Sequence, residues 1–248
     1  MKKMVLLICL LLLGGCASQE KMQRGEESNT RQSARIHTEL GAGYFAQRNI
    51  PIALEEFTEA TQIDPTYAMA YTGLGLVYAA LKEDAKAEAN FKKALQLDPG
   101  SSESHNNYGT FLCSRDRIDE SITQFLEAVK NPLYTTPESA YFNAGVCALK
   151  KKDVTNAEAY LRKALQIQPL MHSAAYQLAS IQYGREDYEQ TRNYLQYALA
   201  DNPAPEVLWL AIRTERKLGG KDAEASYALE LRRRYPESNE AKELLSGK

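Results

Sequence analysis

The chain has 248 residues, with 30 lysines and arginines against 32 aspartates and glutamates, and 44% of its residues are hydrophobic. This near-neutral balance argues against a nucleic-acid-binding protein that relies on a strongly basic surface, and the hydrophobic share argues against a disordered chain. The four cysteines can be interpreted only when their compartment is known.

The N-terminal residues have the pattern of a secretory signal. Two lysines precede an uncharged apolar run over residues 4–13, which is too short to span a bilayer. The sequence Leu-Gly-Gly-Cys that follows, ending at Cys16, resembles the lipobox of bacterial lipoproteins. The resemblance implies that residues 1–15 are a signal peptide that is removed and that Cys16 is lipidated. A plain secretory signal with a coincidental cysteine is the alternative.

Residue 17 is alanine, not the aspartate that the same resemblance associates with retention in the inner membrane. We therefore expect a lipid anchor in the inner leaflet of the outer membrane, which places the protein on the periplasmic face of that membrane. Residues 16–33 are polar and lack apolar periodicity, and we interpret them as a flexible tether with a reach of about 20–25 Å.

A period of 34 residues runs through the rest of the chain. Pro65 and Pro99 are 34 residues apart, and Pro169 and Pro203 are again 34 apart. A period of this length is typical of stacked repeats that bury their apolar faces against one another. The predicted repeats are 34–67, 68–101, 102–137, 138–171, 172–205 and 206–236, followed by a C-terminal cap at 237–248.

Small and bulky residues recur at fixed positions of these repeats. Position 8 is Gly41, Gly75, Gly109, Gly145 and Ala179; position 24 is Phe57, Phe91, Phe125, Leu161 and Leu195; position 27 is Ala60, Ala94, Ala128, Ala164 and Ala198. The small residue at position 8 lets the second helix of a pair approach the first. The pattern resembles the tetratricopeptide repeat, which implies an all-α, right-handed superhelix of six helix pairs with a C-terminal capping helix.

The sixth repeat departs from the pattern. In its predicted register Trp209 is at position 4, Arg213 at position 8 and Arg232 at position 27. Because it lacks the small residues that admit another neighbour, we interpret this repeat as the start of the cap.

Two cysteines remain after removal of the signal peptide and lipidation of Cys16. Cys113 is at position 12 of the third repeat and Cys147 at position 10 of the fourth. Because the first helices of consecutive repeats lie side by side, we expect a disulfide between them in an oxidising periplasm. Two reduced core cysteines are the alternative.

The sequence offers no pattern typical of an enzyme, cofactor or metal site. His37, His105 and His172 are spaced as packing residues, without a second histidine or a cysteine pair at zinc-ligand spacing. No phosphate-binding loop or nucleophile motif is found. We therefore expect no catalytic residues, no cofactor, no metal and no small-molecule substrate; an enzyme is the least favoured class.

The first helices of the repeats present positions 2, 5, 9 and 12 on the concave face of such a superhelix. These positions combine aromatic, aliphatic and amide or hydroxyl groups with little charge, which suits a protein segment as ligand. The candidate protein-binding residues are Arg35, Thr38, Phe45, Met69, Thr72, Leu76, Asn106, Thr110, Phe142, Val146, Tyr176 and Tyr183.

One stretch is more specific than the repeat pattern. Residues 105–113 read HNNYGTFLC, and Asn143-Ala144-Gly145 with Cys147 follows in the next repeat. Together with the lipobox and six repeats, this resembles the pilotin-type lipoproteins of type IV pilus biogenesis. The resemblance implies a non-enzymatic factor that binds pilus secretin subunits and promotes their outer-membrane localisation and multimer assembly. A scaffold lipoprotein for outer-membrane barrel assembly, or for recruiting cell-wall hydrolases, is the alternative.

Overall fold

The computed structural model describes residues 29–246. The predicted signal peptide, Cys16 and residues 16–28 of the predicted tether lie outside the described residues. Within them, the tether prediction is wrong for residues 29–33, which are helical. Ala34 is fully buried, and the Arg31 guanidinium lies 5.6 Å from the centre of the Tyr67 ring. These contacts continue the first helix toward the N-terminus.

The described residues contain helices and no strands, and they form two compact units, residues 29–111 and 112–246. The first unit contains a helix over residues 29–46, α2 (Ile50–Ile63), α3 (Ala68–Ala80), α4 (Asp84–Leu97) and most of α5 (Ser102–Ser114). The second unit contains the end of α5, α6 (Ile118–Ala128), α7 (Pro137–Lys150), α8 (Val154–Ile167), α9 (His172–Gly184), α10 (Tyr188–Ala198), α11 (Pro205–Leu218), α12 (Lys221–Arg234) and α13 (Asn239–Leu245).

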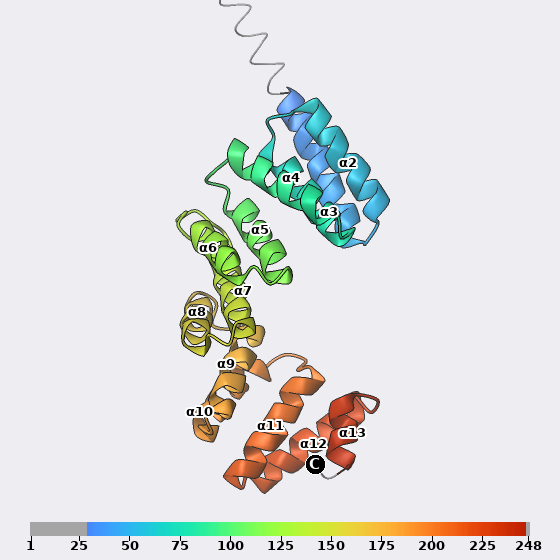
Figure 1. Cartoon of the computed structure of the whole chain (residues 1–248). Coiled ribbons are helices and arrows are strands. Elements are labelled where there is room, and N and C mark those ends of the chain that lie inside the picture. The colour runs from blue at the N-terminus through green and yellow to red at the C-terminus, as the bar shows by residue number, and fades with distance from the viewer. Residues whose placement is uncertain (1–28, 247–248) are drawn as a thin grey trace, which may run out of the picture. The chain divides into compact units, whose positions relative to one another are not determined.

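The helices pack as consecutive pairs (Figure 1). In each pair the first helix, called A, packs on the second, called B: α3 on α4, α7 on α8, α9 on α10 and α11 on α12. Each B helix also packs on the next A helix, as α2 does on α3, α8 on α9 and α10 on α11. This is the packing of tetratricopeptide repeats that the sequence period predicted.

Glycines on the A helices allow this close packing. A Cβ atom on Gly75 would lie 2.8 Å from the Phe91 ring, and one on Gly145 would lie 2.7 Å from Cγ of Leu161. Both partners are the bulky side chains at position 24 of the same repeat. The alanines at position 27 are almost completely buried as well. The prediction that position 8 admits the neighbouring helix is therefore confirmed.

The turn between the helices of each pair has the same geometry. The residue at position 15 has a positive φ of 58° to 62°, and the next N–H donates to the carbonyl oxygen five residues earlier, as Asn49 does to Tyr44 at 2.9 Å. This is the bond that closes a helix in the Schellman motif. The positive-φ residues at position 15 are Arg48, Lys82, Asp116, Lys152 and Glu186.

The sixth pair has the same turn one residue earlier than predicted. Gly219 has the positive φ, 74°, and Gly220 donates to the carbonyl of Glu215. Starting this repeat at Pro205, where α11 begins, brings Gly219 to position 15 and Lys221, the first residue of α12, to position 17. The B helices of the other repeats begin at position 17 too. The predicted register of the sixth repeat was therefore wrong by one residue.

The corrected register changes which residues of the sixth pair are in its core. Ile212, Ala228 and Leu231 now occupy positions 8, 24 and 27, and all three are buried in one cluster that Ala241 of α13 joins. Arg213 moves from position 8 to position 9 and Trp209 from 4 to 5. Helix α13 thus covers the end of the last pair, as the predicted cap does.

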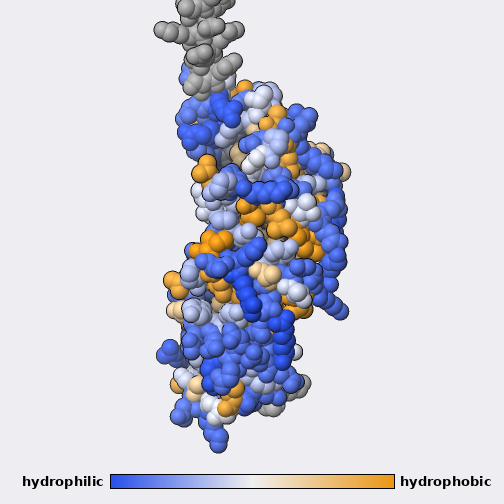
Figure 2. Space-filling view, turned by 90° about the vertical axis from the view of Figure 1, so that its left-hand side faces the viewer, coloured by the Kyte–Doolittle hydropathy of each residue, from blue (hydrophilic) through white to orange (hydrophobic). Residues whose placement is uncertain are grey.

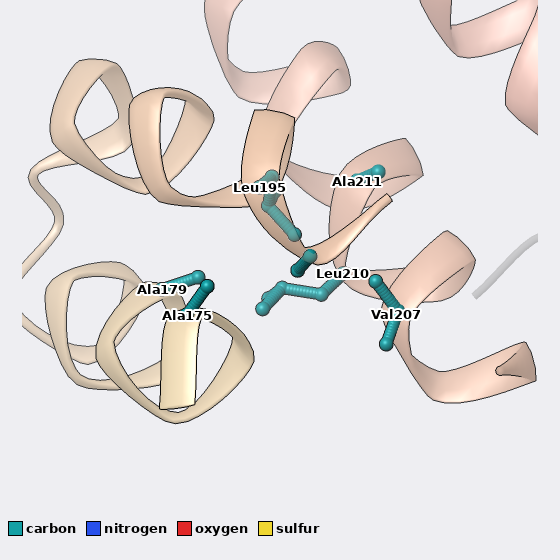
Figure 3. Close-up of a cluster of buried hydrophobic side chains, with 7 residues drawn as sticks. Ala175, Ala179, Leu195, Val207, Leu210 and Ala211 are labelled. Carbon is teal, nitrogen blue, oxygen red and sulfur yellow. The ribbon is translucent and has the colours of Figure 1, made fainter. Parts of the chain in front are cut away.

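Alanines also shape the interface between the last two pairs. Ala175 and Ala179 of α9 face Leu195 of α10 and Leu210 of α11 in one buried cluster (Figure 3). The small α9 side chains let α11 approach, so that the larger leucines fill the space between three helices. This packing fixes α9 and α11 side by side.

Candidate functional site

Two of the predicted binding residues in the first unit are structural. Thr72 is 1% exposed, and its Oγ1 lies 2.7 Å from Oγ of Ser104. Thr38 is buried, and its hydroxyl donates to the carbonyl of Ala34 at 2.8 Å. Both hydroxyls are used within the fold and neither is presented to a partner, so the prediction was wrong for these two residues.

The other candidates of the first unit are at least partly accessible. Arg35 pairs with Glu39 at 2.6 Å on the exposed face of the first helix, and Thr110 donates to the carbonyl of Asn106 at 3.0 Å. Phe45 packs against the cluster around Phe57. The half-buried candidates of this unit are Phe45, Met69, Leu76 and Asn106.

The four candidates of the second unit are half-buried. Phe142 packs on the cluster of Leu161 and Leu178, and Tyr176 and Tyr183 pack on the cluster between α9 and α11. Each ring is therefore held by the core on one side and accessible on the other. Val146 is half-buried on α7 as well.

The corrected register adds α11 to this surface. Positions 5, 9 and 12 of α11 are Trp209, Arg213 and Arg216, which the sequence prediction did not include. Trp209 is 8% exposed and packs in the core cluster with Leu208 and Ile212, so Arg213 and Arg216 are the accessible additions. Gly219, a glycine one residue before the position expected for the turn, was the sequence signal that could have revealed them. We call positions 5, 9 and 12 of α7, α9 and α11 the A-helix face of the second unit. Its residues are Phe142, Val146, Leu149, Tyr176, Ser180, Tyr183, Trp209, Arg213 and Arg216.

An apolar groove lies at the end of this face between α7 and α9. It has a volume of about 500 Å³ and is lined by Leu149, Val154, Gln177, Ser180, Ile181, Gly184 and Arg185. A Cβ atom on Gly184 would meet no atom within 4 Å, so the glycine leaves the groove open. Hydrophobic residues are also visible as separate patches among hydrophilic ones on the face of the molecule in Figure 2.

Two charged contacts join the helix pairs behind this face. The carboxylate of Glu158 on α8 accepts from Gln182 at 2.8 Å and from Arg185 at 2.7 Å, both at the end of α9. On the next pair, Arg192 of α10 donates to Glu215 of α11. The hydrogen bond to Glu215 raises the pKa of Arg192 above its ordinary value. These contacts hold the ends of α9 and α11 in place.

A disulfide joins Cys113 at the end of α5 to Cys147 in α7, with Cα atoms 6.0 Å apart. Cys147 is fully buried, and its sulfur lies 3.2 Å from Oγ of Ser121 on α6. The pairing that the sequence favoured is thus the one in the structure. It fixes α7, the first helix of the A-helix face, to the end of α5.

The three histidines are separate and bonded within the fold. Nδ1 of His37 lies 2.8 Å from Glu56, Nε2 of His105 lies 3.0 Å from the Pro99 carbonyl, and Nδ1 of His172 lies 2.7 Å from the Tyr197 carbonyl. Residues 29–246 hold no cluster of histidine, cysteine and carboxylate side chains that could bind a metal ion. No helix of this part of the chain is long and apolar enough to cross a bilayer.

Comparison with known families supports the repeat assignment. Models described as tetratricopeptide repeat match residues 68–101, 90–123 and 114–172. The first match coincides with the second predicted repeat, and the last covers helices α6 to α8. The matches therefore include parts of both units.

Individual relatives resemble the chain over nearly its whole length. The type IV pilus assembly protein PilF of Pseudomonas aeruginosa is 30% identical over 246 residues, which are 98% of each chain. A solved structure of P. aeruginosa PilF has a TM-score of 0.80 at 29% identity, covering 89% of this chain and 100% of that one. The crystal structure of PilW, described as a widely conserved type IV pilus biogenesis factor, has a TM-score of 0.75 at 30% identity, covering 86% and 99%.

Proposed function

Because this chain belongs to the tetratricopeptide-repeat family of type IV pilus biogenesis proteins that includes PilF and PilW, we propose that it binds unassembled subunits of the pilus secretin. It holds a subunit segment on its repeat surface and promotes outer-membrane localisation and multimer assembly of the secretin. The role is binding without catalysis, and it requires no cofactor.

The observation that carries this proposal is the A-helix face of the second unit. Half-buried aromatic rings such as Tyr176 and Tyr183 are anchored by the core, and part of each ring is accessible. Rigid aromatic anchors beside an open apolar groove supply binding energy at low entropic cost. Such a surface suits a protein segment better than a small reactive substrate, because it offers apolar contact without a converging set of catalytic groups.

The lipobox resemblance at Cys16 supports the membrane part of the proposal. Two or three acyl chains, each contributing about 0.8 kcal/mol per buried methylene, hold a protein stably at a membrane. A tethered binding surface raises the local concentration of secretin subunits at the outer membrane. Higher local concentration favours their oligomerisation without a chemical step.

The proposal is tested by affinity capture from solubilised envelopes with the tagged, full-length lipoprotein. We expect the secretin to be recovered, and its multimer state is read from a native gel. Ser180→Glu places a charge in the centre of the A-helix face and is expected to reduce recovery. Ser226→Glu, at an exposed position on α12, is the matched control and is expected to leave recovery unchanged.

The absence of secretin from the wild-type capture contradicts the proposal. Recovery of barrel-assembly proteins or cell-wall hydrolases in its place favours the alternative scaffold functions. Equal loss of secretin with Ser180→Glu and Ser226→Glu shows that binding does not depend on the A-helix face.

A further inference from the structure

Arg213 on α11 is held by aromatic rings instead of by a carboxylate. Its Cζ atom lies 4.8 Å from the centre of the Tyr183 ring and 5.8 Å from that of Trp209. Its Nε atom is buried without a hydrogen-bond partner, and within residues 29–246 its guanidinium forms no ion pair. Trp209 is buried in the core of the last pair, whereas Tyr183 and Arg213 are half-buried positions of the A-helix face, so the cation lies on that face.

Other arginines close to this face are neutralised. Arg185 pairs with Glu158 at 2.7 Å, Arg192 with Glu215 at 2.7 Å and Arg216 with Glu224 at 2.9 Å. Arg213 takes part in none of these pairs. The positive charge next to it is increased by Lys217, whose Nζ lies 6.0 Å from the centre of the Tyr188 ring. The end of the face near α11 therefore carries cationic charge that the fold itself does not neutralise.

The surroundings of Arg213 favour binding of a carboxylate. The faces of Tyr183 and Trp209 hold the guanidinium in a fixed plane and exclude water from one side of it. A guanidinium with unused N–H groups in a partly dry site pairs strongly with a carboxylate, because the two planar groups match and little water must be displaced. An acidic group of a partner is thus the ligand with complementary charge.

The apolar groove shares Leu149 and Ser180 with the A-helix face. Tyr183, which holds Arg213, directly precedes Gly184, which lines the groove with Leu149 and Ile181. A segment that lies along the A-helix face from Arg213 to Leu149 therefore also reaches the groove. With a volume of about 500 Å³, the groove has room for a large apolar side chain.

We infer that the A-helix face of the second unit binds a partner segment in which an aspartate or glutamate lies a few residues from a large apolar residue. The side-chain carboxylate pairs with Arg213, and the apolar side chain occupies the groove at Gly184. The inference rests on the proposed function, so the partner is a segment of the pilus secretin subunit.

The test uses the full-length lipoprotein in detergent and purified secretin subunits, with the dissociation constant measured at low and high salt. Arg213→Gln is expected to weaken binding about tenfold or more, because it removes the guanidinium and its charge and leaves a shorter, uncharged polar side chain. Arg233→Gln, an exposed position on α12, makes the same charge change elsewhere and is expected to leave the dissociation constant unchanged. Raising the salt concentration should weaken wild-type binding more than Arg213→Gln binding.

A second pair of variants tests the groove. Gly184→Leu fills it and is expected to weaken binding at least as strongly, whereas Gly184→Ala adds one methyl group in open space and retains binding. Thermal unfolding of every variant at or above the wild-type temperature excludes misfolding as the cause. Probing overlapping peptides of the secretin with the same proteins identifies the segment, and changing its acidic residue to the amide should weaken wild-type binding but not Arg213→Gln binding.

The outcomes separate this inference from the proposed function. If wild-type protein binds no secretin subunit, both the proposed function and the inferred segment are wrong. If it binds and Arg213→Gln binds equally well, the secretin is the partner and the inference about the acidic segment is overturned. Bound peptides that lack an acidic residue, or that bind only through a free terminal carboxylate, also overturn it.

Discussion

The guanidinium of Arg192 on α10 donates two hydrogen bonds to the carboxylate of Glu215 on α11, at 2.8 and 2.7 Å. The side chain of Glu215 is 8% exposed and that of Arg192 is 34% exposed. Gly220 makes this arrangement possible, because a Cβ there would lie 2.2 Å from Oε2 of Glu215. The pair joins consecutive repeats directly behind the A-helix face.

Removing one partner of this ion pair should lower the free energy of unfolding more than removing both partners. We expect Arg192→Met to lower the free energy of unfolding by about 2–3 kcal/mol, because Glu215 is left buried and unpaired. The double variant Arg192→Met, Glu215→Leu should be closer to wild type than the single variant, since no charge remains buried. Urea unfolding checks both values, and additive losses in the double variant contradict the coupling.

Substitution of two A-helix glycines by alanine should have opposite effects on the stability of the protein. A Cβ on Gly73 would lie 2.2 Å from Cε1 of Phe57, whereas Gly184 has open space around that position. Gly73→Ala should destabilise the protein by about 1–3 kcal/mol through overpacking. Gly184→Ala should be neutral or stabilising by up to about 1 kcal/mol, because alanine favours the helix. Thermal unfolding distinguishes them, and equal effects would contradict the packing described.

Reduction of the disulfide should destabilise the second unit. The bond between Cys113 and Cys147 closes a loop with a sequence separation of 34, for which the loss of chain entropy in the unfolded state is worth about 3–4 kcal/mol. We expect dithiothreitol to lower the unfolding midpoint of the wild-type protein. It should leave the midpoint of Cys113→Ser, Cys147→Ser unchanged, and the same shift in both proteins would contradict a bridged pair.

The stability contributed by Asp153 should depend on pH. Its carboxylate caps α8 by accepting from the N–H of Asn156 at 3.2 Å and from its side-chain amide at 2.7 Å. These hydrogen bonds lower the pKa of Asp153 below its ordinary value of 3.8. A lowered folded-state pKa gives stability that is complete above the unfolded-state pKa and is lost as the pH falls through the folded-state value.

The wild-type protein should therefore unfold at a higher temperature than Asp153→Ala at neutral pH. The difference between the two unfolding temperatures should shrink as the pH falls below 3.8. It should vanish once the carboxylate is protonated in the folded and the unfolded state. Thermal unfolding of the two proteins over a pH series measures it. A difference that is constant down to strongly acidic pH would show that ionisation of Asp153 does not contribute.

The repeat architecture was predictable because its signals recur. Gly75 and Gly145 occupy the same position of their repeats, because a side chain of the B helix lies close to each of them. The same packing requirement recurs every 34 residues and is therefore visible in the sequence. The register of the sixth repeat was not predictable from the period, because Gly219 adopts the positive φ one residue earlier than its counterparts. That single residue decides whether Arg213 lies in the core or on the A-helix face.

The candidate site was predictable only in part. Position 5 is occupied by the accessible ring of Tyr176 in one repeat and by the buried hydroxyl of Thr72 in another. The hydroxyl of Thr72 is buried against Ser104, which belongs to the next repeat. Contacts between repeats are not visible in the spacing of one repeat. The pairing of Arg192 with Glu215, from consecutive repeats, likewise required the structure.

The most direct test of the account is the state of the secretin in cells that lack this chain. Outer-membrane fractions are compared from a deletion strain, from that strain with the wild-type chain restored, and from the strain with Cys16→Ala. We predict that secretin multimers are lost from the outer membrane in the deletion strain, are restored by the wild-type chain and are not restored by Cys16→Ala, although that variant folds. Normal outer-membrane multimers in the deletion strain or with Cys16→Ala would contradict the account.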